Sequence, residues 1–172
     1  MPAGSNTQRP LEVTPAQVQA WLEAVADPEI PVLSIADLGI LRDVLCRDGE
    51  LVVVITPTYS GCPAMHAIEQ AIGAELRRHG VEHFHVHTRL APAWSSDWIT
   101  AAGRRKLLDY GIAPPAQSAS GRREPPDGEP RVACPRCGSA QTTRISEFGS
   151  TACKAFYRCG DCLEPFDYFK CI

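Results

Sequence analysis

Residues 51–63 read LVVVITPTYSGCP, and this stretch decides how the N-terminal part of the chain folds. Its first five residues form a continuous apolar run, which predicts a buried strand at 51–55. From Met65 onward apolar residues recur at helical spacing as far as Gly80, which predicts a helix over about 63–79. We therefore expect a strand-to-helix turn with Cys62 at the start of the helix.

The thiol of Cys62 is the candidate functional group of this turn. Pro63 suits the first helical position, because its missing N–H would be unpaired there in any case, and Cys62 is then the expected N-cap. Free backbone N–H groups and the positive end of the helix dipole favour a thiolate at such a position. Hydroxyl side chains, including that of Thr58, surround it in the sequence. The alternative is an inert, buried cysteine that only caps the helix.

The flanking sequence predicts further elements on both sides of the turn. Thr14 and Gln17 match a capping box and Pro15 suits the first helical position, so a helix is expected to begin there. Residues 1–12 are expected to be a disordered lead-in. The other expected elements are an ordered loop at 27–40, strands at about 39–46 and 82–90, a hairpin turn at 47–50, a loop with two tryptophans at 91–100 and a helix at about 100–110 that ends at Gly111.

The expected strand at 82–90 places three histidines, His83, His85 and His87, on one face. Histidine is a common metal ligand, so this face is one candidate metal site. A metal site also needs ligands that converge from other elements. We therefore favour an exposed face or an interface, for which a homodimer is one option.

The distribution of cysteines separates a second module from the first. Residues 113–131 have no apolar periodicity and are rich in proline, glycine, serine and charge, so they are expected to be an extended linker. After the linker, two C-x-x-C pairs follow, Cys134 with Cys137 and Cys159 with Cys162. Two such tight turns present four thiolates to one ion, so residues 132–172 are expected to form a structural zinc ribbon that the metal helps to fold.

Two cysteines of this module, Cys153 and Cys171, fall outside the pairs. They are alternative metal ligands. Six thiols in one small module also leave an iron–sulfur cluster open, although the spacing does not match ferredoxin patterns. Acidic and basic residues are balanced in this module, so it does not present a phosphate-binding surface.

Composition excludes several classes of partner. The chain has 172 residues and a net charge of −3, which argues against nucleic acid or an anionic membrane as a partner. The first ten residues lack the apolar core of a signal peptide, and no aliphatic run is long enough to span a bilayer. With no secretion signal, the eight cysteines favour metal ligation or reactive thiols over disulfides, so a cytoplasmic protein is expected.

Four segments of the first domain, 13–112, together resemble the MIP18/DUF59 family of iron–sulfur assembly factors. They are DPEIP at 27–31, DLGI at 37–40, TPTYSGCP at 56–63 and PAWSSDWI at 92–99. The ribbon, with SEFGSTACK at 146–154 and FDYFKC at 166–171, is similar to the PaaD family of accessory proteins of phenylacetyl-CoA 1,2-epoxidase systems. The resemblance implies an α+β fold, in which a small mixed β-sheet is packed by helices and is followed by a small all-β zinc ribbon.

The resemblance also implies a function. In the family the cysteine of the turn is the functional one, a position held here by Cys62, and Asp27 and Glu29 lie near it by the same analogy. It implies a maturation factor for a di-iron oxygenase or its iron–sulfur reductase, with Cys62 as a transient cluster ligand and the other epoxidase subunits or the reductase as partners. Two alternatives stay open. One is a structural subunit with an inert Cys62, and the other is an enzyme with Cys62 as nucleophile and His66, one helical turn away, as its base.

Overall fold

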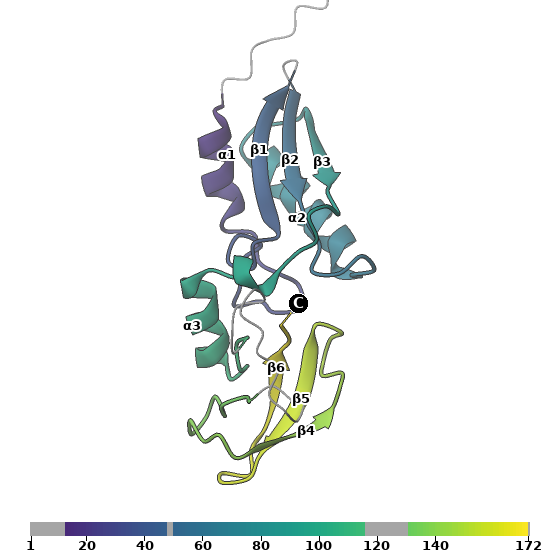
Figure 1. The fold of residues 1–172 in the computed structure, drawn as a ribbon. Coiled ribbons are helices and arrows are strands. Elements are labelled where there is room, and N and C mark those ends of the chain that lie inside the picture. The colour runs from purple at the N-terminus through teal and green to yellow at the C-terminus, as the bar shows by residue number, and fades with distance from the viewer. Residues whose placement is uncertain (1–12, 48–49, 116–130, 172) are drawn as a thin grey trace, which may run out of the picture.

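The computed structural model describes residues 13–47, 50–115 and 131–171, which form two modules joined at one end (Figure 1). The expected lead-in at 1–12, the tip of the hairpin turn and residues 116–130 of the expected linker lie outside the described residues. The N-terminal module contains three α-helices and a mixed sheet, and the ribbon at 131–171 contains a second sheet. The expected fold class is therefore confirmed. No helix in the described ranges is long and apolar enough to cross a membrane.

The N-terminal module is built around a three-stranded sheet in the order β1-β2-β3. Strand β2 pairs antiparallel with β1 and parallel with β3, and helix α2 makes the crossover between the parallel strands. The elements in chain order are α1 (Pro15–Leu22), β1 (Leu41–Arg47), β2 (Glu50–Ile55), α2 (Ala64–Arg78), β3 (Phe84–Thr88), the 3-10 turn η1 (Ser96–Trp98) and α3 (Ala101–Tyr110).

Local signals fix the helix ends as the sequence predicts. The backbone N–H of Gln17 donates to the Thr14 hydroxyl at 3.3 Å, and the Gln17 side chain accepts from the Thr14 N–H at 2.9 Å, which completes the capping box at α1. Thr100 caps α3 through its hydroxyl, which accepts from the N–H of Gly103 at 2.9 Å. Gly111 ends α3 with a φ of +92°, a backbone conformation that residues with a side chain rarely adopt.

One face of the sheet packs against the helices to form the main core. The inward side chains of β2, Val53 and Ile55, are completely buried against Ile68, Ile72 and Leu76 of α2. These positions recur at helical spacing in α2 and alternate in β2, as the two periodicities require. The core therefore holds the end of β2 and the start of α2 in fixed positions, and the turn that contains Cys62 lies between them.

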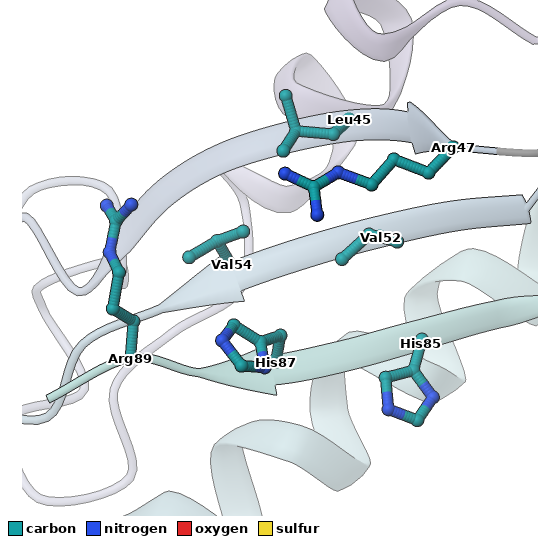
Figure 2. Close-up of a pocket in the computed structure, with 7 residues that line it drawn as sticks. All are labelled: Leu45, Arg47, Val52, Val54, His85, His87 and Arg89. Carbon is teal, nitrogen blue, oxygen red and sulfur yellow. The ribbon is translucent and has the colours of Figure 1, made fainter.

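The opposite face of the same sheet is open (Figure 2). His85 and His87 lie here beside Val52 and Val54, and both histidines are exposed. His83 is not part of the predicted row, because β3 begins only at Phe84. Among the described residues the histidines do not belong to any cluster of potential metal ligands, so the structure does not support the metal-site option. A homodimer contact on this face remains a prediction.

The tryptophan loop holds the ordered loop at 27–40 in place. The indole N–H of Trp94 donates to the carbonyl of Leu38 at 2.9 Å, and Trp94 is itself buried. Gly39 has a φ of +68°, and a Cβ on it would lie 2.6 Å from the Cβ of Trp98. The position accepts only glycine for both reasons. Packing is therefore the role of these tryptophans, and it fixes the loop that begins with Asp27.

The ribbon is an antiparallel sheet in the order β4-β5-β6. Its strands are β4 (Thr142–Ser146), β5 (Lys154–Cys159) and β6 (Pro165–Phe169). Three aromatic side chains, Tyr157, Phe166 and Tyr168, form a small core with ring centroids 5.6 and 5.9 Å apart. The ribbon thus has a core of its own, built from aromatic residues of β5 and β6.

The two modules are joined by backbone pairing and by shared packing. The N–H of Ala113 donates to the carbonyl of Asp167, and the N–H of Phe169 donates to the carbonyl of Ala113, both at 2.9 Å. Ala113, predicted as the first residue of the linker, therefore belongs to this junction. Phe169 is 1% exposed and packs in the core of the N-terminal module, where its ring lies 5.9 Å from that of Trp94.

Candidate functional site

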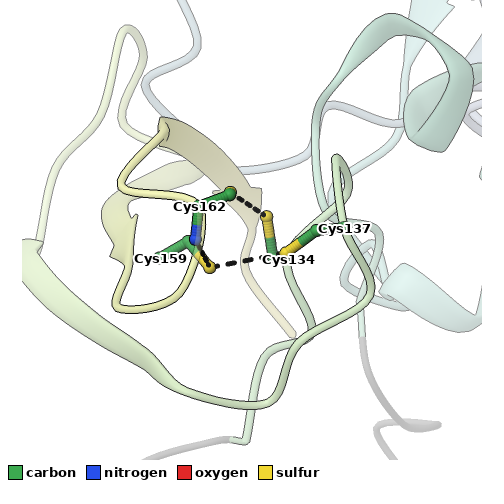
Figure 3. Close-up of side chains that lie close together, drawn as sticks. All are labelled: Cys134, Cys137, Cys159 and Cys162. Carbon is green, nitrogen blue, oxygen red and sulfur yellow. Dashed lines mark hydrogen bonds between the residues drawn. The ribbon is translucent and has the colours of Figure 1, made fainter.

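Four cysteines of the ribbon gather around one point (Figure 3). The Sγ atoms of Cys134 and Cys162 are 3.7 Å apart, those of Cys137 and Cys159 are 3.6 Å apart, and all four lie within 4.8 Å of one another. A zinc ion with four Zn–S bonds of about 2.3 Å separates its sulfurs by about 3.8 Å in a tetrahedron. The donor set therefore fits a tetrahedral zinc ion in type, number and spacing.

The two C-x-x-C turns position these sulfurs through their backbones. In the first turn the N–H of Arg136 points at the Cys134 sulfur at 3.4 Å, and the N–H of Gly138 donates to the Cys134 carbonyl at 2.8 Å. Gly138 has a φ of +75°, which explains the glycine after the second cysteine of the pair. In the second turn the N–H of Cys162 points at the sulfur of Cys159 at 3.5 Å.

These backbone N–H groups also favour the charged form of one sulfur. The N–H of Cys162 is the largest influence on Cys159, and the pKa of the Cys159 thiol falls to about 7. A metal ion therefore displaces a proton from Cys159 more easily than from an ordinary thiol. The pKa values of Cys137 and Cys162 are raised instead, so the four thiols do not titrate alike before metal binds.

The two remaining cysteines of the ribbon lie elsewhere. Cys171 is partly buried, with its sulfur 3.3 Å from the Tyr168 hydroxyl, and Cys153 is 4% exposed in the core of the N-terminal module. Neither belongs to the four-cysteine cluster. The expectation that they are alternative ligands of the ribbon metal therefore finds no support in their positions.

The turn after β2 forms as the sequence predicts, with a shift of one residue. Helix α2 begins at Ala64 with Pro63 as its N-cap, so the prediction that Cys62 is the N-cap and Pro63 the first helical residue is wrong by one position. The N–H of Cys62 donates to the carbonyl of Tyr59 at 3.2 Å, which closes the turn. The N–H of Ala64 still lowers the pKa of the Cys62 thiol, as expected for a sulfur beside the first turn of a helix.

Asp27 and Glu29 lie near Cys62, as the family resemblance implies. Asp27 is 5% exposed, and its Oδ1 accepts from the N–H groups of Glu29 at 2.9 Å and Ile30 at 2.8 Å. Both carboxylates raise the pKa of the Cys62 thiol electrostatically, and the Thr58 hydroxyl lowers it. The structure thus brings these four predicted residues together in one place, between the 27–40 loop and the turn.

This environment makes the Cys62 thiol less acidic. Burial is the largest influence and raises the pKa of Cys62, and the charges of Glu29 and Asp27 raise it further. The N–H of Ala64 and the hydroxyl of Thr58 lower the pKa but do not outweigh these effects. The helix start does favour the thiolate through the Ala64 N–H, but the expected net lowering of the pKa is wrong, because desolvation and two nearby carboxylates outweigh this local effect.

Two residues of the ribbon complete the surroundings of this site, and sequence reasoning assigned neither to it. Cys153 reaches the core of the N-terminal module, and Lys154 is a lysine only 3% exposed. The charge of Lys154 lowers the pKa of Asp27 and of Glu29, against the burial that raises both. The sequence signal was the presence of cysteines outside the C-x-x-C pairs, but their spacing does not show where the ribbon docks.

His66, the base that a Cys62 nucleophile would need, points elsewhere. It is exposed on α2, and its Nε2 lies 3.0 Å from the side-chain nitrogen of Gln70. The strongest influences on the Cys62 thiol are burial, the Ala64 N–H, Glu29, Thr58 and Asp27. The geometry gives no support to a cysteine–histidine pair.

Comparison with known proteins identifies both modules. Residues 15–84 match a family described as iron-sulfur cluster assembly protein, and residues 118–170 match the PaaD zinc beta ribbon domain. The putative 1,2-phenylacetyl-CoA epoxidase D-subunit of Escherichia coli (strain K12) is 49% identical over 168 residues, which cover 96% of this chain and 99% of that protein.

Two further relatives match the N-terminal module. An Fe-S protein maturation auxiliary factor of Porphyromonas gingivalis (strain ATCC BAA-308 / W83) is 30% identical over 96 residues, which cover 55% of this chain and 90% of that protein. The crystal structure of a domain of unknown function, DUF59, from Bacillus anthracis has a TM-score of 0.50 and 28% identity, covering 54% of this chain and 89% of that one. Both resemblances seen in the sequence are therefore confirmed.

Proposed function

Since the chain belongs to the family of the putative 1,2-phenylacetyl-CoA epoxidase D-subunit, we propose that it acts in an epoxidase system of this kind as a maturation factor. It assists assembly of the iron centre or iron–sulfur cluster of a partner subunit or of the reductase. Cys62 is the transient ligand of that cargo, and the four ribbon cysteines hold a structural zinc ion. The observation that carries the proposal is the cluster of Cys62, Asp27, Glu29 and Thr58 in the module that matches iron–sulfur assembly proteins.

The raised pKa of Cys62 suits a ligand that must also release the metal. At neutral pH the thiol is protonated, so a metal ion has to displace the proton before the sulfur can bind it. This competition weakens the complex. Thiolate sulfur selects soft metals and iron–sulfur clusters, whereas Asp27 and Glu29 add hard oxygen donors and negative charge beside it. A site of this kind is suited to accept iron and to hand it on.

Zinc in the ribbon has a structural role in this proposal. The core of the ribbon gathers eight buried residues, three of them aromatic, which is too little to stabilise a module of this size alone. Four thiolates around one zinc ion leave no open coordination position for a substrate. The ribbon metal is therefore a resident ion, distinct from the cargo at Cys62.

Co-expression tests the proposal. The other epoxidase subunits and the reductase are produced with the wild-type chain, with Cys62→Ala, or with Cys46→Ala as a matched control on an exposed thiol of β1. We expect Cys62→Ala to fold and to retain zinc, and to lower both the iron content and the activity of the oxygenase. Cys46→Ala should behave as wild type. Normal iron content and activity with Cys62→Ala would overturn the proposal.

A second candidate is a structural subunit of the oxygenase complex. It is favoured by large apolar side chains on the ribbon surface, since Ile145, Phe148 and Leu163 are each more than half exposed. Purification separates the two candidates. A structural subunit stays with the active oxygenase in fixed stoichiometry and its removal abolishes activity, whereas a maturation factor can be removed after the metal centre is loaded.

A further inference from the structure

Cys153 is a ribbon residue that is buried in the other module. It lies in the loop that precedes β5, it is 4% exposed, and it packs in the same core that the partly buried Cys62 contacts. Two hydrogen bonds hold it there. Its sulfur is 3.0 Å from the Thr151 hydroxyl, and its carbonyl accepts from the N–H of Lys170 at 3.0 Å. The thiol is thus held in a defined place away from the ribbon metal.

The contact that brings Cys153 to this place is built and specific. Phe169, which pairs with Lys154 across β5 and β6, is almost completely buried against Trp94 and the N-terminal core. Ala113 adds two backbone hydrogen bonds to β6. An isolated backbone bridge at Ala113 and a buried aromatic contact thus tie the ribbon to the N-terminal module at this point.

The groups around Cys62 and Cys153 are shared. Glu29 acts electrostatically on both thiols, and both thiols act on the Tyr59 hydroxyl. Lys154 acts on Cys153, Asp27 and Glu29, and its Nζ lies 3.8 Å from the carboxylate of Asp167. Glu29 and Tyr59 are therefore within electrostatic reach of both sulfurs, and the buried ammonium group of Lys154 offsets the charge of the carboxylates.

We propose that Cys153 is the second thiol of the Cys62 site, so that a soft metal cargo binds between the two modules. This inference rests on the proposed function, because it names a second ligand for the same cargo. Each thiol loses one proton to solvent when its sulfur binds the metal, so a divalent ion M²⁺ with two bound thiolates releases two protons. Two thiolates leave other coordination positions for Glu29 or for ligands of the donor and acceptor proteins.

The two-thiol site is not closed in advance. Among the described residues, the four ribbon cysteines are the one group in which three or more potential metal-ligand atoms lie within 4.8 Å of one another. Neither Cys62 nor Cys153 belongs to such a set over the described ranges, so a cargo bound between them takes its remaining ligands from elsewhere. The four ribbon cysteines form a complete ligand set that retains its metal, whereas two thiols leave coordination positions through which a cargo can be transferred.

Two probes test the pairing on the full-length, zinc-loaded protein. Phenylarsine oxide joins two neighbouring thiols in one cyclic adduct and releases one water, and the adduct is read by intact mass. Co²⁺ added to the same protein gives a thiolate-to-metal charge-transfer band whose intensity follows the number of bound thiolates. The variants are Cys62→Ser, Cys153→Ser and Cys153→Ala, with Cys171→Ser and Cys46→Ser as controls on thiols outside the pair.

We expect the wild type to form one arsenical adduct and both control variants to keep it. Cys62→Ser and Cys153→Ser should each lose it, and each should lower the Co²⁺ band to about half. An adduct that persists in Cys153→Ser and in Cys153→Ala, both still folded by circular dichroism, would overturn the pairing.

This outcome is separate from the fate of the proposed function. If Cys62→Ala impairs the co-expressed oxygenase while the Cys153 variants keep the adduct, only the pairing fails. If the pair forms its adduct but Cys62→Ala leaves the oxygenase fully loaded with iron, the maturation role fails and the paired thiols stand.

Discussion

Replacing Phe169 with alanine removes the main apolar contact by which the ribbon is held to the N-terminal module. The side chain is 1% exposed, and its ring lies 5.9 Å from that of Trp94 at an angle of 49°. Truncation of a buried phenylalanine to alanine lowers the free energy of unfolding by about 3–5 kcal/mol, from lost burial and the cavity left behind. We expect Phe169→Ala to fall in this range, because its ring packs in the largest core of the molecule.

The assay is guanidinium unfolding followed by circular dichroism and by tryptophan fluorescence, with zinc measured by elemental analysis. Zinc content should not change, since Phe169 pairs with Lys154 at one end of β5 and Cys159 lies at the other. Tryptophan emission should shift to longer wavelength, because Trp94 becomes more exposed to solvent. The matched control is Phe148→Ala, which removes a ring that is 62% exposed and should change stability by less than about 0.5 kcal/mol.

A loss below about 1 kcal/mol for Phe169→Ala, with unchanged tryptophan emission, would refute this account of the junction. A loss of zinc in the same variant would show that docking and metal binding are a single folding unit. The unfolding free energy and the zinc content are both measured on the same samples.

Three further predictions follow from the charges and ligands of the site. Glu29→Gln removes a charge that raises the pKa of Cys62, so alkylation of Cys62 by iodoacetamide should reach its half-maximal rate at a lower pH; an unchanged pH profile contradicts the electrostatic account. Cys134→Ser leaves three ribbon sulfurs, so elemental analysis should show loss of zinc and circular dichroism loss of the ribbon strands; one zinc retained per chain rules out the four-cysteine site. Lys106→Met removes the ammonium group 2.6 Å from Asp37. Burial opposes ionisation of Asp37, but hydrogen bonds led by that of Lys106 hold its pKa below the usual 3.8, so the pair stabilises the fold above this pH and the benefit is lost as pH falls. We expect Lys106→Met to lower the free energy of unfolding by about 0.2–1 kcal/mol at neutral pH and by progressively less as the pH falls below 3.8; a loss that does not change with pH would refute it.

The elements of the fold were predictable because their signals are local. The capping box at Thr14, the period of α2 and the left-handed glycine at Gly111 each act within a few residues of the chain. The two C-x-x-C pairs were predictable for the same reason, since each turn presents its own two sulfurs. The pKa of Cys62 was predicted in the wrong direction, because desolvation and the charges of Asp27 and Glu29 come from the folded environment.

The docking of the ribbon could not be predicted from spacing. Cys153 belongs to neither C-x-x-C pair, and nothing in the sequence distinguishes Phe169 from the aromatic residues of the ribbon core. Which of them faces the other module depends on the register of β5 and β6 and on the pairing of β6 with Ala113. A one-residue shift in register turns each side chain to the opposite face of the strand, so the partners of a residue at the junction follow only from the assembled fold.

Strand β5 links the two metal-related sites in one element. It runs from Lys154, beside Cys153 and the carboxylates near Cys62, to Cys159, a ligand in the ribbon tetrad. If zinc supplies the folding free energy of the ribbon, loss of zinc melts β5 and also withdraws Cys153 and Lys154 from the Cys62 site. On this reasoning a chain without zinc is a chain with half of its proposed cargo site, so cargo binding at Cys62 should weaken when the ribbon zinc is removed.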